Sequence, residues 1–170
     1  DGNLIAAASC EGETAAPCTV GIVKLYDADM DEVGNLSNSD HRLGPVYALA
    51  FSPDGKLLAV GGCIPDGRQC TESRGQISVW DVSEPENPIW LSDTATLRDP
   101  KHTHAGLVKT IAFSPNGERI ASGSYDETII VWEVSQSAPL KPINQLRGHH
   151  SFVNTITFID DYNLASGSDD

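Results

Sequence analysis

VYALAFSPDG at residues 46–55 recurs as VKTIAFSPNG at residues 108–117 and, more faintly, as VNTITFIDD at residues 153–161. A repeated motif with unequal spacing predicts one structural unit joined by loops of different length. The side chains of the first six residues alternate with the two-residue period of a β-strand. The Ser-Pro-Asp/Asn-Gly segment predicts a tight turn, because proline presets φ, Asp or Asn bonds its own backbone, and Gly accepts a positive φ.

Further strands are predicted after these turns. A second strand is expected at residues 57–60, 119–122 and 164–166, and a third, which ends on a tryptophan and an acid, at residues 76–81 and 128–133. A looser fourth strand is expected near residues 89–91 and 142–146. Four short antiparallel strands in each repeat are typical of a β-propeller blade, so the predicted fold class is all-β.

The motifs resemble those of the WD-repeat (WD40) β-propeller family. The resemblance rests on Gly148-His149, Trp132-Glu133, Trp80-Asp81 and the segment ASGSYD at residues 121–126, and it covers essentially the whole chain. It implies full blades at about residues 41–98 and 99–147, a partial blade in residues 1–40, and the start of another in residues 148–170. Because propellers close rings of ~4–8 blades, we expect these three to three and a half blades to belong to a larger ring.

The resemblance also implies a structural hydrogen-bond network. In each full blade it joins a His before the first strand, a Ser or Thr in the second, an Asp in the next turn and a Trp in the third. The residues at these positions are His104, Ser122, Asp126 and Trp132 in one blade and His149, Ser166 and Asp170 in the next. A Ser/His/Asp set also suggests a hydrolase. Repetition in successive blades favours a structural role, since a catalytic triad is needed once, and we therefore predict no catalytic residues.

The two earlier blades depart from this pattern. The residues at the network positions are Arg42, Val60 and Arg74 in residues 41–98, and Ala7, Val20 and Tyr26 in residues 1–40. We expect these blades to be held together by packing instead. The same blades carry the longer insertions between the second and third strands, at residues 10–19 and 63–73.

All four cysteines lie in those two insertions, as the pairs Cys10 and Cys18, and Cys63 and Cys70. Each pair brackets its own loop, so a disulfide within each loop is possible if the Cα atoms lie ~4.4–6.8 Å apart. Four thiolates could instead share a Zn²⁺, but the separations exceed the ~2–4 residues usual for structural zinc. Loop disulfides are expected in an oxidising compartment and free thiols elsewhere.

Composition narrows the class of partner. The formal net charge is −13, which argues against nucleic acid or an anionic membrane surface as a partner. No apolar run approaches the ~18 residues of a membrane span. His102 and His104 lack a third metal ligand in sequence reach, and the acidic run at residues 27–32 lacks the glycine of a calcium loop. We expect no metal or cofactor and take the cytoplasm as the default location.

Binding is therefore expected rather than chemistry. In the family, the start of the first strand of each blade and the loops between the second and third strands share one rim. Tyr47, Leu107, Lys109, Tyr125, Phe152 and Asn154 are expected on it. We predict a non-catalytic scaffold or sensor that presents this rim to a protein or peptide partner. Another domain of the same polypeptide is one such partner. The alternative is an accessory propeller of a larger multidomain enzyme or signalling protein.

Overall fold

The computed structural model describes residues 4–10, 18, 20–36, 43–64, 74–94, 97, 102–135 and 138–170. Within these ranges the regular structure is all β-strand. They contain no helix long and apolar enough to cross a membrane. The predicted all-β fold class is confirmed.

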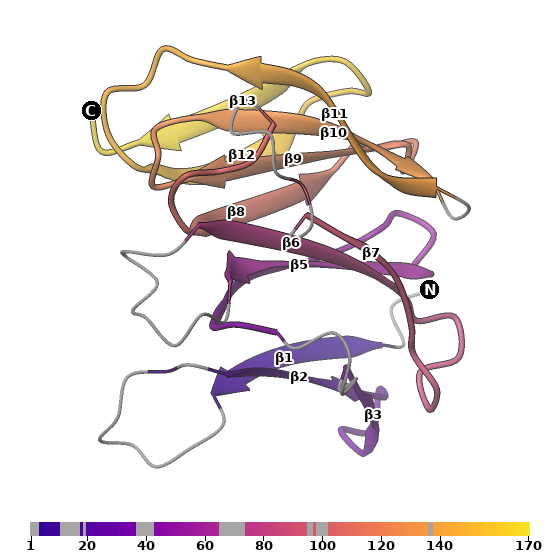
Figure 1. Cartoon of the computed structure of the whole chain (residues 1–170). Helices are drawn as coiled ribbons and strands as arrows, with labels where there is room; N and C mark the ends of the chain where they lie inside the picture. Colours follow the sequence, from indigo (N-terminus) through magenta and orange to yellow (C-terminus); the bar gives the residue numbers. More distant parts are fainter. Residues whose placement is uncertain are drawn as a thin grey trace.

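The strands form antiparallel sheets that we call blades 1 to 4 (Figure 1). Blade 1 has the order β1 (Ile5–Cys10), β2 (Gly21–Tyr26) and β3 (Glu32–Asn35). Blade 2 has β4 (Val46–Phe51), β5 (Leu57–Cys63), β6 (Gly75–Asp81) and β7 (Ile89–Asp93). Blade 3 has β8 (Val108–Phe113), β9 (Arg119–Ser124), β10 (Ile129–Ser135) and β11 (Ala138–Leu146). Blade 4 has β12 (Val153–Phe158) and β13 (Leu164–Ser168).

The blades stack face to face in chain order, from blade 1 at the base of Figure 1 to blade 4 at its top. Apolar clusters fill the interfaces: around Val23 and Leu58 between blades 1 and 2, around Ile77 and Ile120 between blades 2 and 3, and around Val153 between blades 3 and 4. A smaller cluster of Cys63, Leu107 and Tyr125 adds to the interface of blades 2 and 3. Each blade thus buries its faces against its neighbours, as expected for repeats that share a continuous core.

The turns after β4 and β8 follow their sequence signature. The amide of Gly55 donates to the carbonyl of Ser52 at 2.9 Å, and Gly117 donates to Ser114 at the same distance. The glycine φ angles are 72° and 74°, in the left-handed region that favours glycine. These turns return the chain along the blade and fix the pairing of its first two strands.

Strand direction alternates along each blade, so the blades share two rims. The top rim holds the starts of β4, β8 and β12 and the ends of β5, β9 and β13. The bottom rim holds the turns β4–β5 and β8–β9 and the turns β2–β3 and β6–β7. The strands follow the predicted order, but the blade limits near residues 40 and 98 fall outside the described residues and stay predictions.

Candidate functional site

Blade 3 holds a network of four side chains near the top rim. His104 Nε2 lies 2.7 Å from Ser122 Oγ, and His104 Nδ1 lies 3.1 Å from Asp126 Oδ2. The indole Nε1 of Trp132 donates to Ser122 Oγ at 2.8 Å. The structure therefore brings His104, Ser122, Asp126 and Trp132 together in the arrangement that the resemblance implies.

Thr128 extends the network, although it is not among the positions that the resemblance implies. Its hydroxyl donates to Asp126 Oδ1 at 2.6 Å, and its amide donates to the same oxygen at 3.0 Å. The sequence does contain a local indication of this contact, since an Asp commonly accepts a hydrogen bond from the backbone amide two residues ahead. Thr128 and Asp126 together close the turn between β9 and β10.

Asp126 is held as a carboxylate. Burial by itself raises its pKa, but hydrogen bonds from His104, Thr128 and the amide of Ala105, with the charge of His104, outweigh burial and lower the pKa to about 2. His104 is 2% exposed and Ser122 is fully buried. A substrate in solution has no contact with Ser122 Oγ, so the arrangement can hold the blade but presents no accessible nucleophile.

Blade 4 repeats part of this network in an exposed setting. His149 Nε2 lies 2.8 Å from Ser166 Oγ, and His149 Nδ1 lies 3.1 Å from Asp170 Oδ1. A hydrogen bond from the amide of His150, together with one from His149, lowers the pKa of Asp170. The side chains of His149 and Asp170 are about a quarter exposed, so this copy is much more open to solvent than that of blade 3.

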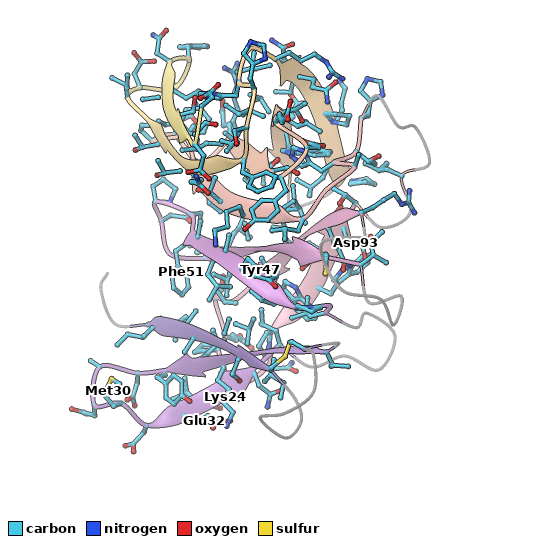
Figure 2. All side chains as sticks on the ribbon, turned by 90° about the vertical axis from the view of Figure 1, so that its left-hand side faces the viewer. Lys24, Met30, Glu32, Tyr47, Phe51 and Asp93 are labelled. Atoms are coloured by element: carbon cyan, nitrogen blue, oxygen red, sulfur yellow. A yellow bond between two sulfur atoms is a disulfide. The ribbon has the colours of Figure 1, made fainter. Side chains whose placement is uncertain are left out.

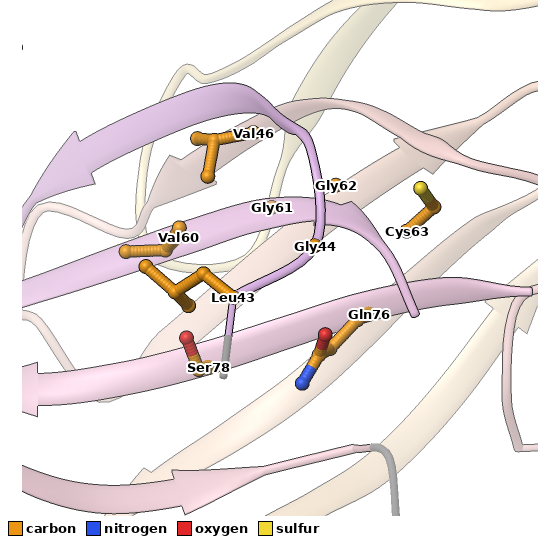
Figure 3. Close-up of a pocket in the computed structure, with 9 residues that line it drawn as sticks. All are labelled: Leu43, Gly44, Val46, Val60, Gly61, Gly62, Cys63, Gln76 and Ser78. Carbon is orange, nitrogen blue, oxygen red and sulfur yellow. The ribbon is translucent and has the colours of Figure 1, made fainter. Parts of the chain in front are cut away.

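Blade 2 fills the corresponding place with apolar side chains (Figure 3). Backbone hydrogen bonds set the equivalence, because Gly21 donates to the carbonyl of Leu43 as Gly75 donates to that of His104. Leu43 therefore takes the histidine position that the sequence comparison gave to Arg42, which lies outside the described residues. Leu43 and Val60 belong to one buried cluster. The space left beside them is about 10 Å³, at or below the volume that one water needs.

The tryptophan of blade 2 still has a hydrogen-bond partner. Trp80 Nε1 donates to Ser78 Oγ at 3.0 Å, two residues back on the same strand. Packing alone was expected in this blade, so Ser78 is a correction to that expectation. Ser78 corresponds to Ile130 in blade 3, and the indole therefore bonds to its own strand in blade 2 and to the neighbouring strand in blade 3.

A bulge at the start of the first strand shapes the top rim. Pairing skips one residue in each case, at Tyr47 in β4, Lys109 in β8 and Asn154 in β12. A bulge re-aims the side chain of the extra residue. Across from the second bulge, a Cβ on Gly123 would lie 2.6 Å from Val153 Cγ1, so the glycine lets the next blade approach.

Aromatic side chains gather on the top rim beside these bulges. Tyr125 and Phe152, from adjacent blades, are stacked with ring centroids 4.0 Å apart and planes 10° apart. Lys109 Nζ lies 5.7 Å from the centroid of the Tyr47 ring. Tyr47 and Phe152 are 47% and 42% exposed, and Asn154 donates to Asp169 at 2.7 Å. Figure 2 shows Tyr47 near one end of β4 and Phe51 near the other.

Leu107 is the one member of the predicted surface that the structure buries. It is 2% exposed and packs with Cys63 and Tyr125 beneath the rim. A partner on the rim would not touch it, so its place in the predicted contact set is corrected to a support for Tyr125.

The cysteines of the described residues are disulfide-bonded. A disulfide joins Cys10 and Cys18, whose Cα atoms lie 5.7 Å apart. Cys63 is also in a disulfide, while Cys70 lies outside the described residues. By strand register, Cys10 and Cys63 occupy the position that Tyr125 has in blade 3. No group of three potential metal ligands occurs in the described ranges.

Comparison with known proteins gives a consistent result. The family model described as "WD domain, G-beta repeat" matches residues 34–81, 94–133 and 140–170. The WD repeat-containing protein VIP3 of Arabidopsis thaliana is 31% identical over 95% of this chain and 48% of its own length. Protein HIR1 of Kluyveromyces lactis is 34% identical over 56% of this chain and 11% of its own length. The chromatin assembly factor 1 subunit FAS2 homolog of Oryza sativa is 31% identical over 59% of this chain and 18% of its own length. The chain thus spans less than half the length of each of these relatives.

Proposed function

The chain belongs to the WD-repeat family of β-propeller proteins, and from this premise we propose that its top rim binds a protein or peptide partner without catalysing a reaction. A role in protein interaction is supported by the family itself and by the name of one relative, a chromatin assembly factor subunit.

The stacked pair Tyr125 and Phe152 is the observation that carries the proposal. The two rings span the interface between blades 3 and 4, and Phe152 remains 42% exposed although it stacks. Aromatic groups that are rigid and partly exposed provide much of the energy of protein interfaces when a partner buries them. Tyr47, Lys109 and Asn154 lie on the bulges of the same rim and complete the proposed surface.

The absence of catalysis is proposed on the burial of Ser122 and His104 and on the repetition of their arrangement in blade 4. The net charge of −13 supports a protein over a nucleic acid as the partner. A basic or neutral surface on the partner suits this charge better than an acidic one.

Alanine substitution of the rim tests the proposal. We expect the variant Tyr47→Ala, Tyr125→Ala, Phe152→Ala to lose at least about tenfold in partner affinity, since aromatic hot spots cost about 2 kcal/mol or more on truncation. Proteins captured from cell extract by wild-type and variant chains would be compared by quantitative mass spectrometry, with retained folding checked by circular dichroism.

A matched control tests whether a loss of capture is specific to the top rim rather than a general result of removing exposed apolar side chains. Ile159 and Tyr162 are 69% and 76% exposed in the β12–β13 turn of the bottom rim, and Ile159→Ala, Tyr162→Ala should leave capture unchanged. Capture of the same proteins at the same level by the rim variant would show that the partner binds elsewhere.

Two observations on the compartment disagree, because the name of a relative points inside the cell and the disulfide of blade 1 points to an oxidising compartment. We propose a location inside the cell, which the name of the chromatin assembly relative supports more for chromatin than for the cytoplasm. A reducing compartment would hold Cys10 and Cys18 as thiols, whereas the structure pairs them. Intact mass of the protein isolated under alkylation would distinguish the two, and four alkylated thiols would support the intracellular location.

A second candidate is an accessory propeller within a larger multidomain protein. The observation that favours it is the small share of HIR1 that this chain covers, 11%. Cross-linking of the protein as it occurs in cells would test it, since Lys109 should then cross-link to another domain of the same polypeptide rather than to a separate protein.

A further inference from the structure

A pocket of about 580 Å³ lies on the bottom rim between blades 1 and 2, opposite the proposed partner surface. Its lining comes from the start of blade 1, the β2–β3 turn, the end of β4 with its turn, and the segment after β6. We call it the bottom groove, and its wall includes Leu4, Asp27, Val33, Phe51, Asp54 and Val82. Its volume lies within the ~300–1,000 Å³ usual for ligand sites.

The floor of the bottom groove is apolar. Val82 is 2% exposed and belongs to the cluster between blades 1 and 2, and Leu4, Val33 and Phe51 pack against that cluster while staying partly exposed. In Figure 2, Phe51 and Met30 both lie on the left-hand side of the stack of blades. Met30, in the β2–β3 turn, is 65% exposed. An apolar side chain entering the groove would cover surface that now faces water.

Two carboxylates, those of Asp27 and Asp54, line the groove beside its apolar floor. Asp27 Oδ1 accepts bonds from the amides of Asp29 and Asp31, each at 3.0 Å. Asp54 Oδ1 accepts from Ser52 Oγ at 2.6 Å and from the amide of Lys56 at 3.2 Å. In the described part of the chain no hydrogen bond reaches Oδ2 of either residue. Each carboxylate therefore keeps an oxygen that can accept a charge-assisted bond from a ligand.

The charge around the groove is mostly negative. Asp29, Asp31, Glu84 and Glu86 belong to the two turns that flank it, and among the described residues of its lining Lys56 is the one cation. The hydrogen bond from Ser52 lowers the pKa of Asp54, which therefore stays charged. An anionic ligand would be repelled here, and a cationic one attracted.

We propose that the bottom groove binds a peptide segment in which a large apolar side chain stands next to a lysine or arginine. The apolar side chain would lie on Phe51 and Val33, and the cation would bond to Oδ2 of Asp27 or Asp54. Charge complementarity selects this class of peptide over acidic peptides. The site is separate from the top rim and does not depend on the function proposed for it.

Selection of random nonapeptides on the full chain tests the proposal. Enriched peptides should pair Lys or Arg with Leu, Ile, Met or Phe. Their affinity, measured by fluorescence anisotropy, should fall about fivefold in Asp27→Asn, Asp54→Asn, because each exposed ion pair adds less than ~1 kcal/mol. The turn should survive, since Asn116 takes the equivalent place in blade 3 and its Oδ1 accepts from Ser114 and Glu118 as Asp54 Oδ1 does from Ser52 and Lys56.

The control variant Glu133→Gln, Asp161→Asn removes the same charge from residues outside the groove, and peptide affinity should not change in it. Equal affinity for the groove and control variants, or enrichment of acidic or uncharged peptides, would overturn the proposal. Sedimentation that showed a dimer dissociating only in the groove variant would overturn it as well, because a second copy of the chain would then occupy the groove. The proposal would also fail if the enriched peptides lost binding in the top-rim triple variant and kept it in the groove variant, because they would then bind the other surface.

Discussion

Blades 2 and 3 have the same four-stranded sheet and the same Ser-Pro-Asp/Asn-Gly turn, yet they secure their tryptophans by different means. In blade 3, Trp132 ends a chain of hydrogen bonds through Ser122 and His104 to Asp126. In blade 2, Trp80 bonds to Ser78, and Leu43 and Val60 fill the rest. The indole N–H thus has a hydrogen-bond partner in both blades, while packing replaces the polar network around it in blade 2.

The largest effect should come from giving blade 3 the residue of blade 2. Ser122→Val removes the oxygen shared by His104 Nε2 and Trp132 Nε1 and leaves two buried polar atoms without a partner. We expect a loss of about 3 kcal/mol in the free energy of unfolding, since unsatisfied buried groups cost about 1–3 kcal/mol each. Urea unfolding followed by tryptophan fluorescence measures it. A loss below that of Ile159→Ala, an exposed control, would show that the network adds nothing to packing.

A smaller effect should follow the charge of Asp126. Its folded pKa of about 2 lies below the ordinary value of 3.8, so its contribution is complete above pH 4 and lost as pH falls toward 2. Over this pH range the lowered pKa of Asp126 contributes about 2 kcal/mol to the free energy of unfolding. Asp126→Asn should be less stable than wild type by about this amount at pH 7, and the two should converge near pH 2. Parallel stability curves from pH 7 to pH 2 would contradict this assignment.

The smallest effect should come from the substitute bond in blade 2. Ser78→Ala removes the partner that Trp80 Nε1 has among the described residues and should cost about 1 kcal/mol. Ser83→Ala, in the exposed turn after β6, serves as the control and should be neutral. If Ser78→Ala proved neutral while Ser122→Val did not, the tryptophan of blade 2 would be held by packing alone, as its sequence had led us to expect.

The repeat motif was sufficient to predict the strands and their order. Residues 46–51 and 108–113 alternate and end at a turn signature, and the structure has strands at these same positions. These features are local, because a two-residue period and a positive-φ glycine depend on neighbours in sequence. The resemblance then supplied the four members of the blade 3 network, which the structure brings within hydrogen-bond distance of one another.

The top rim was less accessible to sequence reasoning. Leu107 and Phe152 each directly precede the valine that begins a first strand, yet Leu107 is 2% exposed beneath Tyr125 and Phe152 is 42% exposed. Leu43, and not Arg42, occupies the histidine position because the segment before β4 is one residue shorter than the segment before β8. Counting back a fixed number of residues from the first strand could not detect this difference in length. The bulges at Tyr47, Lys109 and Asn154 have no signature of their own.

The amino-acid sequence alone thus determined that this is a chain of antiparallel blades, since strand period, turns and the tryptophan-acid pairs act within each repeat. Which side chains share a surface depends instead on the tertiary fold. The stack of Tyr125 on Phe152, the partner of Trp80 and the groove between blades 1 and 2 all depend on how neighbouring strands and blades approach one another. That approach is set by the packing of large and small side chains across the blade interfaces, and no short segment of sequence encodes it.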